Sequence, residues 1–233
     1  MTKSVLVTGA NRGIGLEIVR GFAQQGFKVV MACRDESLGL EARQDVVGGD
    51  IHVIEMALDK EQSIIDAFVR ADAVYGPFNI LVNNAGALDH RGWDELTTDG
   101  LHDAMQLHVA APLTLIKQAL PSMLASGFGR IINVSSGWGS FNEGLEGPLS
   151  YAVSKSALNA LTVKIANEIK AEHGDDCDVT VNSMCPGWVH TRMGGTDAPR
   201  TPEEGADTAL WLGVHKKGGP NGAFLRDRKC IDW

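Results

Sequence analysis

Short apolar runs alternate with segments of helical periodicity along the whole chain. The apolar runs are nearly continuous in Val, Ile and Leu, which is typical of strands buried on both faces of a parallel sheet. The predicted strands are Ser4–Thr8, Lys28–Cys33, Ile51–Met56, Ile80–Asn83, Arg130–Ser135, Val179–Cys185 and a weaker Ala223–Leu225. The predicted helices between them are Gly13–Gln25, Ser37–Val47, Glu61–Val74, Leu101–Ala125 and Ser150–Glu172.

This alternation predicts an α/β fold, a Rossmann-type doubly wound parallel sheet of about seven strands with helices on both faces. No linker or repeat divides the chain, so we expect a single domain over residues 1–233. Gly194–Pro202 and Lys216–Gly222 are interpreted as loops. A sheet of this kind binds ligands at the carboxyl ends of its strands, near the point where strand order reverses.

Composition narrows the class of partner. The formal net charge of −8 argues against nucleic acid or an anionic membrane as the main partner. Residues Met1–Val7 enter an apolar strand at once, without the pattern of a cleavable signal. The four cysteines form no C-x-x-C pair, and no histidine lies in a ligand set of suitable spacing, so we expect no metal. Reduced thiols fit a cytoplasmic location.

A glycine-rich turn, Thr8–Gly15, follows the first predicted strand and opens the first helix. Glycines at 9, 13 and 15 permit a tight turn and close approach of the backbone to a pyrophosphate, while the helix offers free N–H groups. The spacing is G-x-x-x-G-x-G rather than G-x-G-x-x-G. The alternative is a glycine turn that binds no nucleotide.

The second strand ends without the carboxylate that usually binds the ribose 2′-hydroxyl of NAD. Arg34 instead offers a planar fork of donors that suits a 2′-phosphate, and Arg12 could approach the same group. We therefore expect NADP(H) in preference to NAD(H). The alternative is that Arg34 pairs with Asp35 or Glu36 on the surface.

Tyr151 and Lys155 are four residues apart on a predicted helix and so share one face. The cation would favour the ionised phenol and bring its pKa from about 10 toward neutrality. Such a phenol can protonate a carbonyl oxygen or deprotonate an alcohol. Taken alone, the pair also fits an exposed helix face.

Taken in order, these motifs resemble the short-chain dehydrogenase/reductase family over essentially the whole chain. They are Thr8–Gly15, Asn83-Asn84-Ala85-Gly86, Asn133-Val134-Ser135-Ser136, Tyr151–Lys155, and Pro186-Gly187 with Thr191. Cys185–Val189, Thr201–Ala206 and the closing Trp233 are similar to its NADPH-dependent carbonyl reductase branch.

The resemblance implies a catalytic set. Tyr151 would be the general acid or base, and Lys155 would bind the nicotinamide ribose. Ser136 would donate a hydrogen bond to the substrate oxygen, because the family uses the second serine of the pair, and Ser135 would be structural. The implied cofactor-binding residues are Gly9, Asn11, Arg12, Gly13, Ile14, Gly15, Arg34, Asn84, Ala85, Gly86, Tyr151, Lys155, Pro186, Gly187, Val189 and Thr191. For Thr191, a helix N-cap is the competing role.

His108 stands where the family usually has an asparagine that holds a water of the proton relay. An imidazole could hold a water as well, and it titrates near neutrality. One hypothesis therefore gives His108 a catalytic relay role; the other packs it between helix and cofactor without one.

Large side chains flanking these positions suggest a partly apolar pocket for a small ketone, aldehyde or quinone: Trp138, Phe141, Leu145, Trp188 and Met193. Core packing or a subunit contact would explain any one of them equally well. The chain lacks the long insertion that keeps some carbonyl reductases monomeric. The helices over Leu101–Ala125 and Ser150–Glu172 could then pair in a homodimer or homotetramer.

Three functions follow from these observations. The first is an NADPH-dependent carbonyl reductase. The second is an NAD-linked dehydrogenase that oxidises a secondary alcohol, which the arginine at position 34 disfavours. The third is a non-catalytic NADP(H)-binding sensor or scaffold, which would be expected to lose the tyrosine or the lysine.

Overall fold

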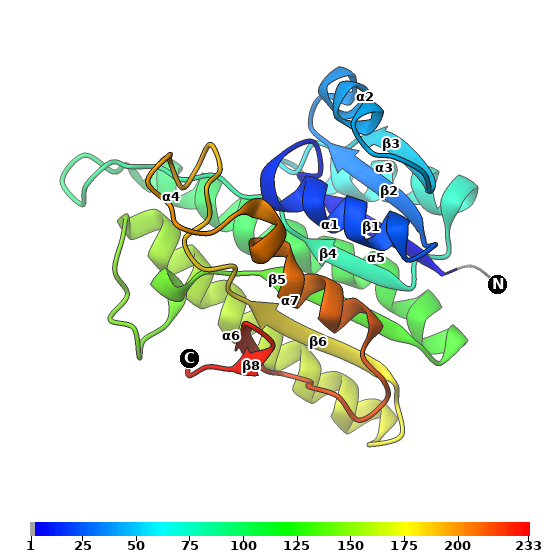
Figure 1. Cartoon of the computed structure of the whole chain (residues 1–233). Coiled ribbons are helices and arrows are strands. Elements are labelled where there is room, and N and C mark those ends of the chain that lie inside the picture. The colour runs from blue at the N-terminus through cyan, green and yellow to red at the C-terminus, as the bar shows by residue number, and fades with distance from the viewer. Residues whose placement is uncertain (1–2) are drawn as a thin grey trace.

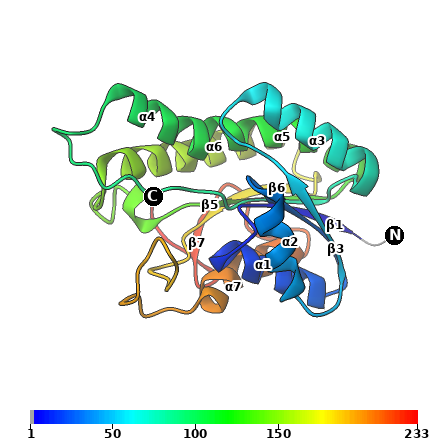
Figure 2. The same cartoon turned by 90° about the horizontal axis from the view of Figure 1, so that it is seen from above.

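One central sheet lies between two layers of helices (Figures 1 and 2). The computed structural model describes residues 3–233; Met1 and Thr2, the first two residues of the segment Met1–Val7 that was searched for a cleavable signal, lie outside this range. The strands are β1 (Ser4–Thr8), β2 (Lys28–Cys33), β3 (Asp50–Glu55), β4 (Ile80–Asn83), β5 (Gly129–Val134), β6 (Val179–Met184), β7 (Phe224–Arg226) and β8 (Lys229–Cys230). The helical elements are α1 (Gly13–Gln24), α2 (Glu36–Gln44), α3 (Glu61–Tyr75), α4 (Thr98–Met105), the π turn η1 (Gln106–Ala110), α5 (Ala111–Ser126), the 3₁₀ turn η2 (Gly137–Gly139), α6 (Leu149–His173) and α7 (Pro202–Val214).

The strand order, β3-β2-β1-β4-β5-β6-β7-β8, confirms the predicted doubly wound fold. Every neighbouring pair is parallel except β7 and β8. The chain runs outward from β1 to β3 and then returns to the other side of β1 as β4, so the order reverses between β1 and β4. The crevice expected of such a reversal therefore lies at the carboxyl ends of these two strands.

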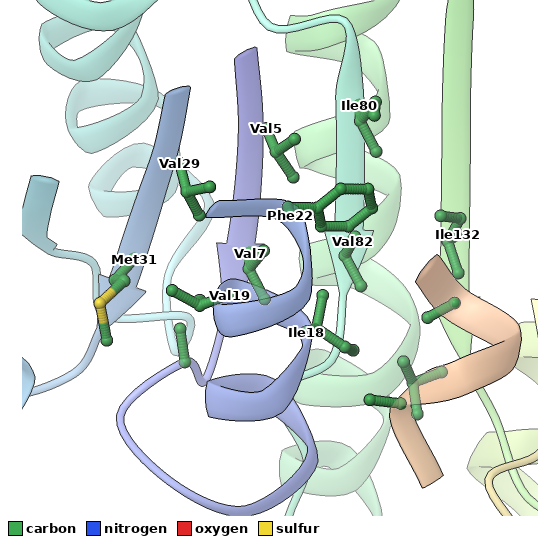
Figure 3. Close-up of a cluster of buried hydrophobic side chains, with 14 of the residues drawn as sticks. Val5, Val7, Ile18, Val19, Phe22, Val29, Met31, Ile80, Val82 and Ile132 are labelled. Atoms are coloured by element: carbon green, nitrogen blue, oxygen red, sulfur yellow. The ribbon is translucent and has the colours of Figure 1, made fainter. Parts of the chain in front are cut away.

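Each face of the sheet carries its own apolar core. On one face α1 lies across the strands and buries Ile18, Val19 and Phe22 completely (Figure 3). Burial of a side chain of this size stabilises the fold by about 1.5–3 kcal/mol. α7 packs beside α1, while α3, α5 and α6 cover the opposite face (Figure 2). The two cores hold rigidly the strand ends from which the crevice loops leave.

Three elements differ from the sequence prediction. β8 is an eighth strand of two residues, joined to β7 by Asp227 and Arg228, which both have positive φ (52° and 60°). α7 begins at the last residue of the loop predicted over Gly194–Pro202. Its start is a capping box, in which the Thr201 hydroxyl accepts from the Glu204 N–H and the Glu204 carboxylate accepts from the Thr201 N–H.

The helix predicted over Leu101–Ala125 is interrupted by the π turn η1. Pro112 has no N–H to donate to the carbonyl of His108 four residues earlier, and the Ala111 N–H reaches back five residues to the Gln106 carbonyl. The wider turn carries His108, which is buried.

No helix among residues 3–233 has the length and apolar character needed to cross a membrane.

Candidate active site

Tyr151 and Lys155 lie one turn apart in the first part of α6, with side chains only 8% and 3% exposed. The Lys155 ammonium lies 5.5 Å from the centre of the Tyr151 ring and donates a 2.8 Å hydrogen bond to the Val134 carbonyl. That carbonyl ends β5, so the lysine is fixed at the carboxyl edge of the sheet. The structure therefore brings the two predicted residues together in a buried place and rules out an exposed helix face.

Burial dominates the pKa values of this pair. Burial raises the pKa of Tyr151 to about 12, with Cys185 raising it further and a hydrogen bond from Ser136 acting the other way. Burial lowers the pKa of Lys155 to about 7. The pKa of the phenol is therefore shifted in the opposite direction to the predicted one, because desolvation of the phenolate by burial is the largest influence on it. The phenol is protonated at neutral pH.

Ser136 follows β5, and its hydroxyl lies near enough to the Tyr151 phenol to lower the pKa of that phenol. Its hydroxyl oxygen accepts a 3.2 Å hydrogen bond from the Trp138 N–H and so caps the short turn η2. Ser135 is instead buried, with its hydroxyl 3.5 Å from the Lys155 carbonyl oxygen. Of the two serines, Ser136 is the one beside the phenol.

His108 is buried in η1 with both ring nitrogens paired. Nε2 accepts from the Ala87 N–H at 3.2 Å, so Nδ1 carries the proton and donates to the Ser154 hydroxyl at 2.8 Å. Burial and the Lys155 charge lower the pKa of His108 to about 2. The expectation that it titrates near neutrality is wrong. The ring is neutral and packs edge-on against Tyr151, with centroids 5.4 Å apart.

The glycine turn forms one wall of the crevice. Gly9 has φ +62°, and a Cβ there would lie 2.9 Å from the Ala85 Cα. A Cβ on Gly15 would lie 2.4 Å from the side-chain nitrogen of Asn84, which itself donates to the Thr8 and Gly9 carbonyls. The Asn84 amide therefore joins the ends of β1 and β4. The free N–H groups at the start of α1 fit a pyrophosphate.

The position after β2 holds an exposed arginine beside an aspartate that caps the next helix. The Asp35 carboxylate caps α2, accepting from the N–H of Ser37 (2.9 Å) and of Leu38 (3.3 Å). The Ser37 hydroxyl, these backbone bonds and, least of all, the Arg34 charge lower the pKa of Asp35. Arg34 is exposed and, among residues 3–233, forms no ion pair. The alternative in which Asp35 or Glu36 pairs with Arg34 is therefore not what the structure shows. Arg12 is exposed as well.

The opposite wall follows β6. Gly187 has φ +78°, and the Thr191 methyl would lie 3.2 Å from a Cβ on Gly13, so Thr191 faces the glycine turn across the crevice. The Thr191 hydroxyl accepts from the Gly194 N–H at 3.1 Å and closes a turn. The next helix, α7, starts only at residue 202, so the alternative of a helix N-cap is wrong for Thr191.

The predicted pocket residues are mostly exposed: Trp138 38%, Phe141 72%, Trp188 57% and Met193 41%. Trp138 lies edge-on to Tyr151, with ring centroids 6.1 Å apart, and its indole packs on Gly147. Leu145 has a positive φ of 51° in the same loop. Of these five predicted pocket residues, Trp138 is the one in aromatic contact with the Tyr151 phenol.

A cavity of about 160 Å³ that the sequence did not predict lies beside His108. Its lining includes Ser150, next to Tyr151, and the charged residues Asp89, Arg91 and Asp103. These charged residues lie in a loop and on α4 and match no sequence motif, so their spacing could not have predicted that they line a cavity.

Comparison with known proteins agrees with this geometry. Residues 3–201 match the family described as short chain dehydrogenase. Carbonyl reductase (NADPH) 1 of Rattus norvegicus is 30% identical over an alignment of 284 positions, which covers 98% of this chain and 97% of the relative. Carbonyl reductase Sniffer of D. melanogaster superposes with a TM-score of 0.86 at 27% identity, covering 100% of both chains. An NADPH-bound carbonyl reductase from chicken fatty liver gives a TM-score of 0.83 at 31% identity, covering 100% of this chain and 99% of that one.

The chain therefore belongs to the short-chain dehydrogenase/reductase family and is an oxidoreductase. The predicted similarity to carbonyl reductases is confirmed by these relatives.

Proposed function

We propose that this enzyme reduces the carbonyl group of ketones and aldehydes, and of quinones, with NADPH. The observation that carries the proposal is the meeting of Ser136, Tyr151 and Lys155 at the carboxyl edge of the sheet, beside the glycine crevice. NADPH, when bound, supplies the hydride. The protein supplies the proton and the orientation of the carbonyl.

Each of the three residues has a role suited to its position. The Ser136 hydroxyl donates to the substrate oxygen, and the Tyr151 phenol gives that oxygen its proton. Lys155 binds the nicotinamide ribose from its place beside the end of β5. A phenol with its pKa raised to about 12 is protonated throughout the physiological range, as a proton donor must be.

We assign His108 as a positioning residue. Its neutral ring joins the backbone of Ala87, in the loop after β4, to Ser154 on α6, and it packs against Tyr151. Both nitrogens are used by the protein, which leaves neither for a relay water.

NADP(H) is the proposed cofactor in preference to NAD(H). Arg34, with Arg12, offers positive donors where a 2′-phosphate would lie, and the neighbouring Asp35 carboxylate is committed to the α2 cap. The residues of the crevice walls would hold the rest of the dinucleotide: Gly9, Asn11, Gly13, Ile14, Gly15, Asn84, Ala85, Gly86, Pro186, Gly187, Val189 and Thr191.

We further propose that residues 1–233 act as one catalytic domain in the cytoplasm and that the protein is a homodimer or homotetramer. Leu113 on α5 and Val153 on α6 are 37% and 46% exposed, which fits pairing of these helices between subunits. In size-exclusion chromatography at micromolar concentration we expect an apparent mass of about twice or four times that of the 24.9 kDa chain. Elution at the mass of a monomer would contradict this proposal.

The test of the proposed function is a spectrophotometric screen of ketones, aldehydes and quinones with NADPH and NADH side by side. We expect oxidation of NADPH with several carbonyl compounds and much slower oxidation of NADH. Faster turnover of an alcohol with NAD⁺ would favour the oxidative alternative, and cofactor binding without any turnover would favour a sensor.

A further inference from the structure

Cys185, the residue after β6, is the meeting point of four hydrogen bonds. Its sulfur accepts from the backbone N–H groups of Gly137 (3.2 Å) and Gly187 (3.4 Å). It also accepts from Nε and Nη2 of Arg226, each at 3.3 Å. The side chain is 3% exposed, so these donors surround a sulfur that is withdrawn from solvent.

Arg226 extends this network to the loop before Tyr151. Its Nη2 also donates to the Glu143 carboxylate at 2.8 Å. The ion pair lies directly on Gly137: a Cβ there would be 2.1 Å from the carboxylate oxygen and 2.6 Å from Nη2. The guanidinium therefore touches the backbone just after Ser136, and only glycine at position 137 permits this approach.

The two backbone groups bound by the sulfur belong to opposite sides of the reacting centre. Gly137 follows Ser136, whose hydroxyl lies near enough to the Tyr151 phenol to lower its pKa. Gly187 follows Pro186, on the crevice wall after β6. The loop is also tied to the end of the chain, because the Ser140 hydroxyl donates to the Asp232 carbonyl at 3.1 Å and the Asn142 N–H to the Trp233 carbonyl at 3.0 Å.

We propose that Arg226 and Cys185 are positioning residues, which fix the catalytic Ser136 relative to the Pro186-Gly187 wall of the cofactor crevice. The inference rests on the proposed function. Arg226 lies on β7, whose position is fixed by the sheet. Through its hydrogen bonds to Cys185 and Glu143, it restrains the loop that follows Ser136. Misplacement of a hydrogen-bond donor by a fraction of an ångström slows the chemical step more than it weakens binding.

The same hairpin offers a matched control. Arg228 pairs with Asp207 of α7, donating from Nε at 2.7 Å, and it is not among the donors to Cys185. Arg226→Met and Arg228→Met therefore each remove one guanidinium and one ion pair from the β7–β8 hairpin. Only the first removes donors from Cys185.

The experiment compares kcat, KM and NADPH affinity of the two variants with the carbonyl substrate that wild type reduces fastest. We expect Arg226→Met to lower kcat by roughly ten-fold with NADPH affinity within two-fold of wild type. Arg228→Met should leave kcat within two-fold. Cys185→Ser, which keeps an acceptor, should retain more activity than Cys185→Ala. Equal kcat for Arg226→Met and Arg228→Met would overturn the proposal.

A second measurement does not depend on turnover. Amide hydrogen exchange in residues 137–143 should be faster in Arg226→Met than in wild type and Arg228→Met. If the wild-type protein turned over no carbonyl compound, the proposed function would be refuted, but faster exchange in Arg226→Met would still support the anchoring of this loop. Exchange in Arg226→Met equal to that in wild type would refute the anchoring itself. If Arg226→Met does not fold, Glu143→Gln replaces it, with a smaller change expected in the same direction.

Discussion

Replacement of the buried Lys155 by methionine is expected to stabilise the protein while it abolishes activity. The pKa of Lys155 falls from 10.5 to about 7 on folding because burial disfavours the ammonium. At about 1.4 kcal/mol for each factor of ten in proton affinity, keeping this group charged costs the folded protein about 4–5 kcal/mol at pH 7. Methionine removes that cost, but the Val134 carbonyl then loses its partner, which costs about 1–3 kcal/mol. The net expectation is a gain of about 1–4 kcal/mol.

The pH dependence identifies the cause. A lysine with a lowered folded-state pKa binds fewer protons folded than unfolded between pH 7 and 10.5, so its destabilisation is full below pH 7 and fades as the pH rises toward 10.5. Urea unfolding of wild type and Lys155→Met at fixed protein concentration should therefore differ most at pH 6–7 and much less at pH 9.5.

Lys164 provides the control, because it lies on the same helix with its side chain 72% exposed. Lys164→Met should change stability by at most about 0.5 kcal/mol, without this pH dependence. A Lys155→Met variant less stable than wild type at pH 7, or a difference that does not shrink at pH 9.5, would refute the reasoning.

Three further outcomes test separate parts of the account. Arg34→Ala should raise the KM for NADPH by about 10–100-fold, through loss of a charged phosphate contact, and leave that for NADH nearly unchanged; equal effects on both cofactors would contradict this. His108→Asn should leave the shape of the pH–rate profile between pH 5 and 8 unchanged, because the pKa of the ring is already about 2; loss of an ionisation near pH 6–7 would show a titrating role. Arg130→Met should destabilise by about 3 kcal/mol in urea unfolding, because the 1% exposed guanidinium pairs with Asp178; a change below about 1 kcal/mol would contradict that pairing.

The parallel sheet could be predicted because strands that are buried on both faces consist of nearly continuous runs of apolar residues. β8 could not, since two residues carry no periodicity and its turn uses Asp227 and Arg228 instead of the usual Asn-Gly. α7 could have been found, because Thr201-Pro202 with Glu204 is a recognisable helix start.

The sequence predicted which residues come together at the candidate site, but it could not predict how deeply they are buried or how burial shifts their pKa values. The sequence places Tyr151 beside Lys155, yet the directions of their pKa shifts depend on how deeply the fold buries them. His108 changed from an expected titrating group to a neutral one for the same reason. Cys185 and Arg226 are 41 positions apart and share no motif, so only the packing of β7 beside β6 reveals their contact.

The most direct test of the central claim is the turnover of Tyr151→Phe with a carbonyl substrate and NADPH, measured together with NADPH binding. Phenylalanine keeps the ring and its packing against His108 and Trp138 but removes the proton donor. We expect turnover to fall by about 10²–10⁴-fold with cofactor affinity retained. Turnover equal to that of wild type would show that the proton reaches the substrate by another route.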